Sequence, residues 1–260
     1  MTIHTHLISG AGNTFHIAYS NKWNHPSGHP SIAKTICEKN KADGFIFLEK
    51  VPDEKNIVEK YKWYFFNNDG SDAEMCGNAT RCVGFYIKNI LKSEQNSWFL
   101  KTTAGLIRID FISAEKYKIK MTPPQVLKSE AGFYCDTGVP HLVIENDHIV
   151  TDEKLMRAAR ELRQSAQFSP RGTNVTYVVL DSAVNRIKAV SYERGVEDFT
   201  AACGTGAMAA ALYNLAKRGE KQTQVEMPGG TLMMDLSDLN SPTMIGPAVL
   251  LGSYEYDESI

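Results

Sequence analysis

The chain has 260 residues, a formal net charge of −2 and five cysteines. A chain of this length buries a core large enough to fold without disulfide bonds, and 43% hydrophobic with 22% charged residues is a globular composition. The near-zero net charge argues against nucleic-acid binding, which needs a basic surface. An odd number of scattered cysteines does not suggest a disulfide framework, so we expect reduced thiols.

The first residues carry no sign of export, since a basic start followed by an apolar core is missing. Together with unpaired cysteines, this favours a cytoplasmic protein. The uncharged stretch 199–216 approaches the length of a membrane span, but its early glycines and threonines favour a buried helix, so we expect no membrane contact. The histidine pairs His4/His6 and His25/His29 are expected to be solvated or tag-like.

In chain order, strand-like runs outnumber helical ones. Hydrophobic patterning predicts helices at 31–38, 78–91, 153–164 and 206–217. Strands are predicted at 44–48, 63–66, 106–111, 117–121, 141–144, 176–180 and 187–192. Many strands with few helices indicate the α+β class.

Two apolar helices indicate an internal repeat. Each follows a cysteine and a glycine, Cys76-Gly77 and Cys203-Gly204, and each is followed by a strand and a glycine turn ending at Gly105 or Gly230. The segments Gly12-Asn13 and Gly172-Thr173-Asn174 look like a further matching pair upstream. We therefore expect two similar halves: 1–122, joined by a last strand at 249–260, and 123–248.

A cysteine at the start of a helix lies among unpaired backbone N–H groups, and the helix dipole there favours negative charge. Such a thiol ionises more readily than a free one and can accept a proton near neutral pH. The same N–H groups can hold a carboxylate, which the neighbouring glycines allow to approach. If the starts at Cys76 and Cys203 face each other, one thiolate can remove a proton from a carbon while the other thiol delivers one to its opposite face. That is a stereoinversion without a cofactor.

Other roles for the cysteines have less support. Buried cysteine is most often packing, and we expect this for Cys37, Cys82 and Cys135. Zinc-type spacing and a redox Cys-x-x-Cys motif are both missing, so no metal is expected. Gly10-x-Gly12 lacks the third glycine of a dinucleotide-binding loop.

Longer motifs surround both cysteines. The first contains Asn67-Asn68-Asp69-Gly70-Ser71 and Met75-Cys76-Gly77-Asn78; the second contains Glu193-Arg194-Gly195 and Ala202-Cys203-Gly204-Thr205-Gly206. Shorter motifs lie in order along the chain, namely Gly10-x-Gly12-Asn13-x-Phe15, Gly138-Val139-Pro140-His141, Gly172-Thr173-Asn174, Pro228-Gly229-Gly230 and Gly246-Pro247-Ala248. In this pattern the chain resembles the diaminopimelate epimerase family over essentially its whole length.

The resemblance implies two pseudo-symmetric domains, in each of which a barrel-like sheet wraps around a central helix starting at a catalytic cysteine. It implies an isomerase that interconverts L,L- and meso-diaminopimelate by two-base proton transfer, without a cofactor or metal, for lysine and peptidoglycan synthesis. A homodimer is expected on the same ground.

The resemblance also assigns the site residues. Cys76 and Cys203 would be the acid and base, and His141 and Glu193 would tune their protonation. The backbone around Gly77-Asn78 and Gly204-Thr205 would hold the reacting carboxylate. The residues that would line the pocket and bind the distal amino-acid end are Asn13, Asn67, Asn174, Glu193 and Arg194.

Three positions depart from the family pattern: Val139 stands for a frequent Asn, Gly44 for a common Gln, and Thr14 for the usual Asp. Lost side-chain hydrogen bonds can change specificity strongly. A cofactor-independent racemase of another amino acid, such as histidine, therefore remains an alternative. So does a non-catalytic protein that binds an amino acid. A thiol redox role would require Cys76 and Cys203 to form a reversible disulfide.

Overall fold

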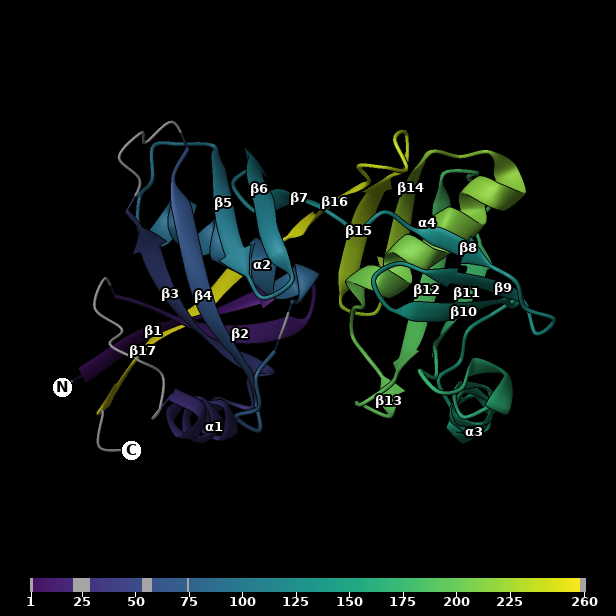
Figure 1. Ribbon diagram of the computed structural model, residues 1–260, viewed down its shortest axis with the longest axis horizontal. Helices are drawn as coiled ribbons and strands as arrows, with labels where there is room; N and C mark the ends of the chain where they lie inside the picture. Colours follow the sequence, from purple (N-terminus) through teal and green to yellow (C-terminus); the bar gives the residue numbers. More distant parts are fainter. Residues whose placement is uncertain (1, 21–28, 53–57, 74, 258–260) are drawn as a thin grey trace. The chain divides into compact units, whose positions relative to one another are not determined.

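The computed structural model describes residues 2–20, 29–52, 58–73 and 75–257, which form two compact units (Figure 1). Unit 1 consists of Met1–Ile119 and Gly246–Ile260, and unit 2 of Lys120–Ile245. The last segment of the chain thus belongs with the first. Each unit contains its own set of strands and its own helices.

The strands of unit 1 follow one another across the sheet, with the C-terminal strand at the edge. In spatial order they are β17 (Val249–Asp257), β1 (Thr2–Gly10), β2 (Asn13–Tyr19), β3 (Gly44–Val51), β4 (Lys60–Asn67), β5 (Ser97–Thr102), β6 (Gly105–Ser113) and β7 (Lys116–Lys120). The pairs β2–β3 and β4–β5 are parallel and the others antiparallel. Parallel neighbours need a crossover, which α1 (His29–Asn40) and α2 (Gly77–Phe85) supply.

Unit 2 repeats this order. Its strands are β8 (Gln125–Leu127), β9 (Phe133–Asp136), β10 (Pro140–Glu145), β11 (Asn174–Leu180), β12 (Arg186–Glu193), β14 (Gln222–Met227), β15 (Gly230–Asp235) and β16 (Thr243–Pro247), with β13 (Asp198–Phe199) added beside β12. The parallel pairs are β10–β11 and β12–β14, crossed by α3 (Glu153–Arg163) and α4 (Gly204–Arg218). The short helices η1 (Tyr86–Ile90) and η2 (Ala166–Phe168) follow α2 and α3.

The chain passes from one unit to the other twice, once before β8 and once before β17. Strand β8 follows β7 in the chain but pairs with β9 of unit 2, and β17 follows β16 but pairs with β1 of unit 1. The prediction of an α+β fold with two related, strand-rich halves is confirmed.

The topology corrects one element of the predicted repeat. Strand β2 corresponds to β10 and β3 to β11, because each pair is the first parallel pair of its unit. Gly12-Asn13 leads into β2, whereas Gly172-Thr173-Asn174 leads into β11, so these segments are not counterparts. Glycine and asparagine recur at strand starts for local turn geometry, which does not specify the strand that follows.

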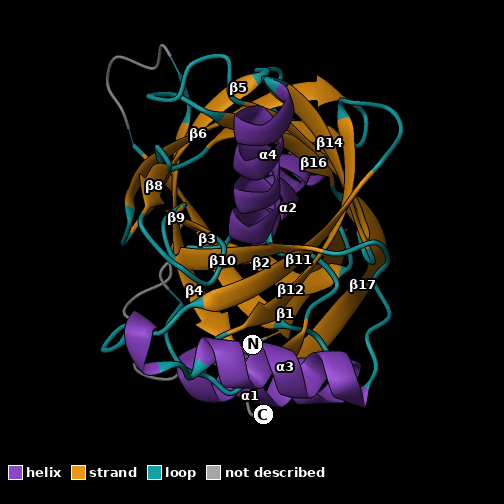
Figure 2. Cartoon of the chain, turned by 90° about the vertical axis from the view of Figure 1, so that its right-hand side faces the viewer, coloured by secondary structure: helices purple, strands orange, loops and turns teal. Residues whose placement is uncertain are grey.

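Helix α4 is enclosed by the strands of unit 2 (Figure 2). It contacts β9, β10, β11, β12, β14 and β15. All residues from Gly206 to Leu212 are buried, and alanines at 207 and 209–211 keep the helix thin enough to fit. Gly219 ends the helix in the left-handed conformation at φ 76°. No helix in the described ranges is both long and apolar enough to span a membrane.

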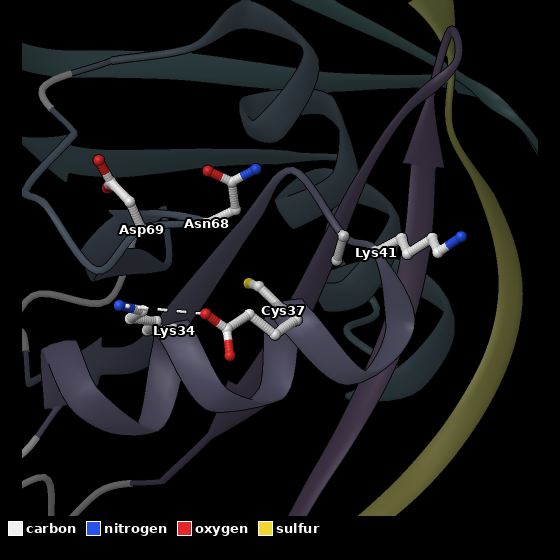
Figure 3. Close-up of a pocket in the computed structure, with 7 residues that line it drawn as sticks. Lys34, Cys37, Lys41, Asn68 and Asp69 are labelled. Atoms are coloured by element: carbon white, nitrogen blue, oxygen red, sulfur yellow. Dashed lines mark ion pairs between the residues drawn. The ribbon is translucent and has the colours of Figure 1, made fainter.

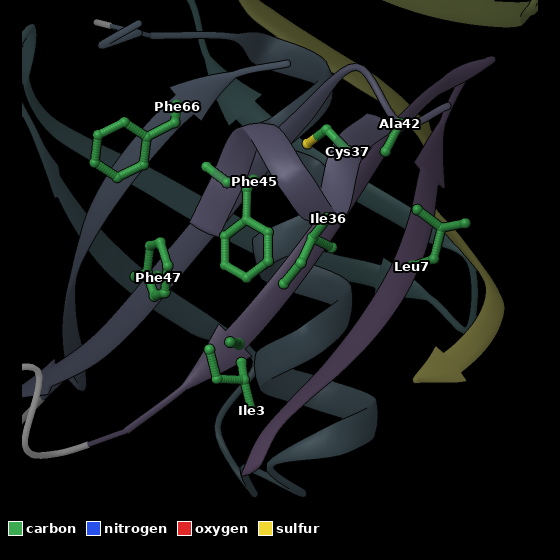
Figure 4. Packing of buried hydrophobic residues seen from close by; sticks show 10 residues of the cluster. Ile3, Leu7, Ile36, Cys37, Ala42, Phe45, Phe47 and Phe66 are labelled. Atoms are coloured by element: carbon green, nitrogen blue, oxygen red, sulfur yellow. The ribbon is translucent and has the colours of Figure 1, made fainter. Parts of the chain in front are cut away.

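Helix α1 covers the outer face of β3 and β4 in unit 1 (Figure 4). Its inner side packs on a core cluster of Ile3, Leu7, Ala18, Ala33, Ile36, Cys37, Ala42, Phe45, Phe47 and Phe66. Cys37, Cys82 and Cys135 are all buried, as expected for packing residues.

The expectation of solvated histidines is wrong for His29 and His6, whereas His4 is exposed as expected. His29 is buried and its ring stacks on Phe47, with centroids 4.1 Å apart. His4 and His6 lie in strand β1, where His4 contacts Glu255 and His6 is half-buried with its ring edge-on to Tyr86. His25 lies outside the described residues. The N-terminal segment alternates between buried and exposed positions, and this period of two was hidden by its polar side chains.

Candidate active site

The two signature cysteines occupy the same position in their units. Cys76 is the N-cap of α2, at φ −141° and ψ 124°, and Cys203 is the N-cap of α4, at φ −122° and ψ 110°. An extended residue at the N-cap leaves the first helical N–H groups without intrahelical partners. Each unit therefore provides a thiol next to an array of backbone donors at the start of its central helix.

In unit 1, the structure joins the start of α2 to the start of β2. The Nδ2 of Asn78 donates to Oδ1 of Asn13 at 2.6 Å. Strand β1 ends close by at Gly10, where an added Cβ would lie only 2.6 Å from the carbonyl oxygen of Asn78. A side chain at position 10 would push the helix start away, so the glycine keeps Cys76 and Asn78 in place.

Asn67 ends strand β4 on the same sheet. Its Nδ2 donates to Oγ of Ser71 at 3.0 Å, so the side chain closes its own turn. The register places Asn67 opposite Gly44, which in turn pairs with Phe15. A Cβ at Gly44 would lie 2.7 Å from the carbonyl oxygen of Phe66, so this chain has no room for the glutamine common in the family.

Arg81 is a functional candidate that the sequence interpretation missed. Its side chain is completely buried on α2, and it donates to the carbonyl oxygens of Gly77 and Pro247 and to Oδ1 of Asn78. Burial lowers its pKa to about 10, which leaves the guanidinium charged at neutral pH, and the neighbouring Cys82 and Cys76 oppose that lowering. A charged residue five positions after the cysteine, on an otherwise apolar helix, is the sequence signal that could have revealed it.

In unit 2, Cys203 is buried in contact with polar groups. Its Sγ accepts from the N–H of Gly206 at 3.3 Å and lies 3.3 Å from Oγ1 of Thr205. Burial raises the pKa of the Cys203 thiol well above its usual value, and the negative charge of Glu193 raises it further. The thiol is therefore protonated at neutral pH.

Glu193 is the carboxyl group beside that thiol. It ends strand β12, and the hydroxyl of Thr200 donates to its Oε1. Burial raises the pKa of Glu193, while hydrogen bonds from Thr200 and Cys203 oppose the rise. The pair consists of a thiol that holds its proton and a carboxylate that can accept it. The structure thus brings together Cys203 and Glu193, as the resemblance implied.

His141 is fully buried at the start of β10, and its tautomer follows from its partners. The backbone N–H of Arg194 donates to Oδ1 of Asn174, so the other amide atom, Nδ2, donates to Nε2 of His141 at 3.3 Å. Since Nε2 accepts, the ring proton lies on Nδ1, 2.9 Å from Oγ1 of Thr176. Burial lowers the pKa of His141 to about 3, so the ring is neutral.

Thr205 links this histidine to the cysteine of the same unit. Its Oγ1 lies 3.0 Å from Nε2 of His141 and 3.3 Å from Sγ of Cys203. Because Nε2 accepts, the threonine hydroxyl donates to it, and the same oxygen contacts the sulfur of Cys203. His141 therefore reaches Cys203 through Thr205.

Arg194 lies on the surface of unit 2. Its guanidinium donates to the carbonyl oxygen of Arg171, and its backbone N–H orients Asn174. The side chain is exposed, with donors that suit a carboxylate ligand. Val139 lies just before β10 and is half-buried, and its apolar side chain contributes no polar group there.

A hollow elsewhere on unit 1 is a weaker candidate. It measures about 440 Å³ and is lined by Lys34, Cys37, Glu38, Lys41, Ala42, Asn68 and Asp69 (Figure 3). Burial raises the pKa of the Cys37 thiol to about 12, which makes it unreactive, and Lys34 pairs with Glu38 at 4.0 Å. The hollow contains none of the predicted site residues.

Comparison with known proteins identifies the family. The sequence profile of the diaminopimelate epimerase family matches residues 9–127 and 133–251. This chain belongs to the diaminopimelate epimerase family. The resemblance in the cysteine motifs is thereby confirmed, and the chain is an isomerase of the epimerase type.

Several relatives align over most of their length. The diaminopimelate epimerase of Aquifex aeolicus is 37% identical over 212 residues, which cover 76% of this chain and 73% of that protein. The diaminopimelate epimerase of a Hydrogenobaculum species is 35% identical over 246 residues, covering 87% and 86%. The match to these members of the family thus includes both units.

Solved structures support the fold. A phenazine biosynthesis protein of the PhzF family from Bacillus anthracis has a TM-score of 0.75 at 14% identity, covering 99% of both chains. A hydroxyproline epimerase from Agrobacterium vitis has a TM-score of 0.66 at 13% identity, covering 98% of this chain and 91% of that one. At such identities the likeness establishes the architecture alone.

Proposed function

We propose that this protein is a diaminopimelate epimerase in which each unit supplies one catalytic thiol. The observation that carries the proposal is that Cys76 and Cys203 cap the two central helices in contrasting surroundings. Arg81 provides a buried positive charge near Cys76, whereas the carboxyl group of Glu193 lies beside Cys203. This contrast supports a resting protein with a thiolate at Cys76 and a thiol at Cys203.

In the proposed reaction, the Cys76 thiolate removes the α-proton and the Cys203 thiol delivers its proton to the opposite face of the same carbon. The products are a Cys76 thiol, a Cys203 thiolate and the inverted amino acid, so protons and charge balance. The reverse direction exchanges the two roles. The raised pKa of Glu193 suits it to exchange a proton with Cys203, and no cofactor is needed because the thiols supply both proton transfers.

The carboxylate at the reacting carbon would be held by the backbone N–H groups of Gly77-Asn78 and Gly204-Thr205, since helix N-termini favour anions. Asn13, Asn67, Asn174, Glu193 and Arg194 would bind the distal end of the substrate. The exposed guanidinium of Arg194 supports this assignment because its planar donors match a carboxylate. The neutral His141 would orient the hydroxyl of Thr205 and act on Cys203 through it.

Hydrogen exchange at the α-carbon tests the proposal. The wild-type protein, incubated with L,L-diaminopimelate in deuterium oxide, should form the meso isomer with deuterium at the inverted carbon. Cys76→Ala and Cys203→Ala should each abolish inversion, whereas Cys135→Ala, which removes a buried thiol of unit 2, should retain it. Full activity in both single alanine variants would exclude the two-thiol mechanism.

A second substrate is the main alternative, and the packing around Gly44 favours testing it. A Cβ at Gly44 would lie 2.9 Å from the ring of Phe65 and 3.3 Å from the ring of Phe15, so a glutamine side chain would not fit at this position. A panel of amino acids that includes histidine, scored for α-deuteration, separates the substrates. Tight calorimetric binding without exchange would instead indicate a non-catalytic binding protein.

The family suggests the biological setting. We propose that the protein is a cytoplasmic homodimer that makes meso-diaminopimelate for lysine and peptidoglycan synthesis. Light scattering on the purified protein measures the oligomeric state. A mass of one chain, close to 28.9 kDa, across the working concentration range would contradict the dimer.

A further inference from the structure

A chain of hydrogen bonds extends from the interior of unit 1 to the start of β2. Arg81, which is fully buried, donates from Nη2 to Oδ1 of Asn78 at 2.8 Å. Asn78, itself only 3% exposed, donates from Nδ2 to Oδ1 of Asn13 at 2.6 Å. These three side chains come from two separate elements, and the chain ends at a residue that is half-exposed.

The donor-to-acceptor direction of these hydrogen bonds is set at the buried end, by Arg81. A guanidinium has donors only, so the amide atom of Asn78 that faces it must be the oxygen. The amide nitrogen of Asn78 then faces Asn13 and forces the oxygen of Asn13 inward. The Nδ2 of Asn13 is left at the outer end, and within the described ranges no hydrogen bond of this group is found.

We propose that Arg81 is a positioning residue that fixes the amide orientation of Asn13 and so makes it a donor for a carboxylate of the substrate. This inference rests on the proposed function, in which Asn13 contacts the distal end of the amino acid. That end carries a carboxylate and an ammonium group. The outward Nδ2 of Asn13 attracts the carboxylate and repels the ammonium group. Arg81 thus affects specificity without contacting the substrate.

The second unit shows that the fold does not require a cation at this position. Met208 stands five residues after Cys203, as Arg81 does after Cys76, and it is completely buried on α4. Another predicted pocket asparagine, Asn174 of unit 2, is oriented by a backbone N–H instead. A buried charge is costly, and its presence on only one of two equivalent helices points to a role beyond packing.

Two substitutions disrupt the hydrogen bonds between Arg81, Asn78 and Asn13 in different ways. Arg81→Met introduces the residue found in α4 and frees both amides to rotate. Asn78→Asp keeps an acceptor for Arg81 but removes the donor to Asn13, so Asn13 should turn its nitrogen inward and present its oxygen. Lys88→Met is the matched control, because it removes a cation from the adjoining helix η1 that donates to Ser93, Gln95 and Asn96.

The first measurement compares diaminopimelate with its distal monocarboxamide as substrate or competitive inhibitor. The wild type should prefer the carboxylate, and Asn78→Asp should reduce that preference about tenfold, the size expected for one hydrogen bond to a charged group. Arg81→Met should reduce it less, mainly through KM, and Lys88→Met should not change it. The double variant should be no worse than Asn78→Asp alone, since both act through one chain. An unchanged preference in Asn78→Asp would overturn the proposal.

The second measurement needs no turnover. In protein labelled with ¹⁵N-asparagine, the side-chain amide of Asn78 should be protected from solvent exchange in the wild type and in Lys88→Met, and should lose protection in Arg81→Met. Retained protection in Arg81→Met would refute the orienting role. If protection is lost as expected but diaminopimelate is not a substrate, the proposed function fails and the positioning role of Arg81 stands.

Discussion

At the scale of single residues, the five cysteines differ in their surroundings. Burial raises the pKa values of Cys37 and Cys135 to about 12 and also raises that of Cys82. The pKa of Cys203 is raised by burial and by Glu193. Cys76 is the one that is half-exposed, at a helix N-terminus with a buried cation nearby.

This difference predicts the order of alkylation. Iodoacetamide at pH 7.5 should label Cys76 first, because the thiolate is the reactive form and the other four thiols are buried and hold their protons. Peptide mass spectrometry over a time course measures the order. In Cys76→Ala the fast phase should disappear. Labelling of Cys203 as fast as Cys76 would contradict the proposed assignment of thiolate and thiol.

Two buried histidines predict how stability depends on pH. Burial lowers the pKa of His141 to about 3 and that of His16 to about 4, against 6.5 for an unperturbed ring. Below pH 6.5 the unfolded chain therefore binds more protons than the folded one. The free energy of unfolding should be steady above that pH and should fall on acidification by up to about 1.4 kcal/mol per pH unit for each histidine.

Urea unfolding between pH 7.5 and 4.5 measures this slope. His16→Asn should make the slope shallower, whereas His4→Gln, which changes an exposed ring, should leave it unchanged. Stability that increases on acidification would show that these rings are charged in the folded protein.

At the scale of elements, the start of α4 is held against two strands. A Cβ at Gly206 would lie 2.1 Å from Oγ of Ser191 on β12 and 3.2 Å from Oγ1 of Thr176 on β11. Those two hydroxyls lie 2.9 Å apart, and Thr176 in turn contacts His141. The glycine therefore sets the distance between the helix start and the histidine strand.

Gly206→Ala should destabilise the protein by about 1–3 kcal/mol, because the added methyl group overlaps a hydroxyl in a packed interior. Ser191→Ala alone should cost about 1 kcal/mol for the lost hydrogen bond. The double variant should be more stable than the sum of the single effects predicts, since removing Oγ makes room for the methyl group. Chemical denaturation of the four proteins completes the cycle, and strictly additive effects would contradict the overlap.

At the scale of the whole molecule, strands distant in the chain complete the first unit. Strand β17 pairs with β1 from Thr2↔Asp257 to Ser9↔Val249, and its Tyr254 and Tyr256 pack on the core of unit 1. The first unit is thus incomplete until the last residues have been made.

A stop codon after Ala248 should therefore destabilise unit 1 selectively. Amides of β1 should lose protection from hydrogen exchange, because the edge that faced β17 becomes open, while β10 and β11 of unit 2 keep theirs. A stop codon after Asp257, which leaves β17 intact, is the control. Unchanged protection of β1 in the shorter protein would show that β17 is dispensable.

Much of the local structure follows from the sequence by itself. Hydrophobic patterning locates the four α-helices to within two residues at most ends, although the predicted helix 78–91 divides into α2 and the π-helical η1. The paired Cys-Gly helix starts also indicate the expected chemistry, and the longer motifs around them indicate the family. These features are local, because helix caps and side-chain periods depend on neighbours a few residues apart.

The tertiary structure alone decides the remaining features. Strand β1 escapes prediction because polar side chains hide its period, whereas β17 lies where a last strand joining the first half was expected. The register between β1 and β17 joins opposite ends of the chain and follows only from the tertiary structure. The same holds for the counterpart of β2, the tautomer of His141 and the buried Arg81. Each depends on which distant groups approach one another, and hydrogen bonding and burial between such groups are set by long-range packing that no local pattern encodes.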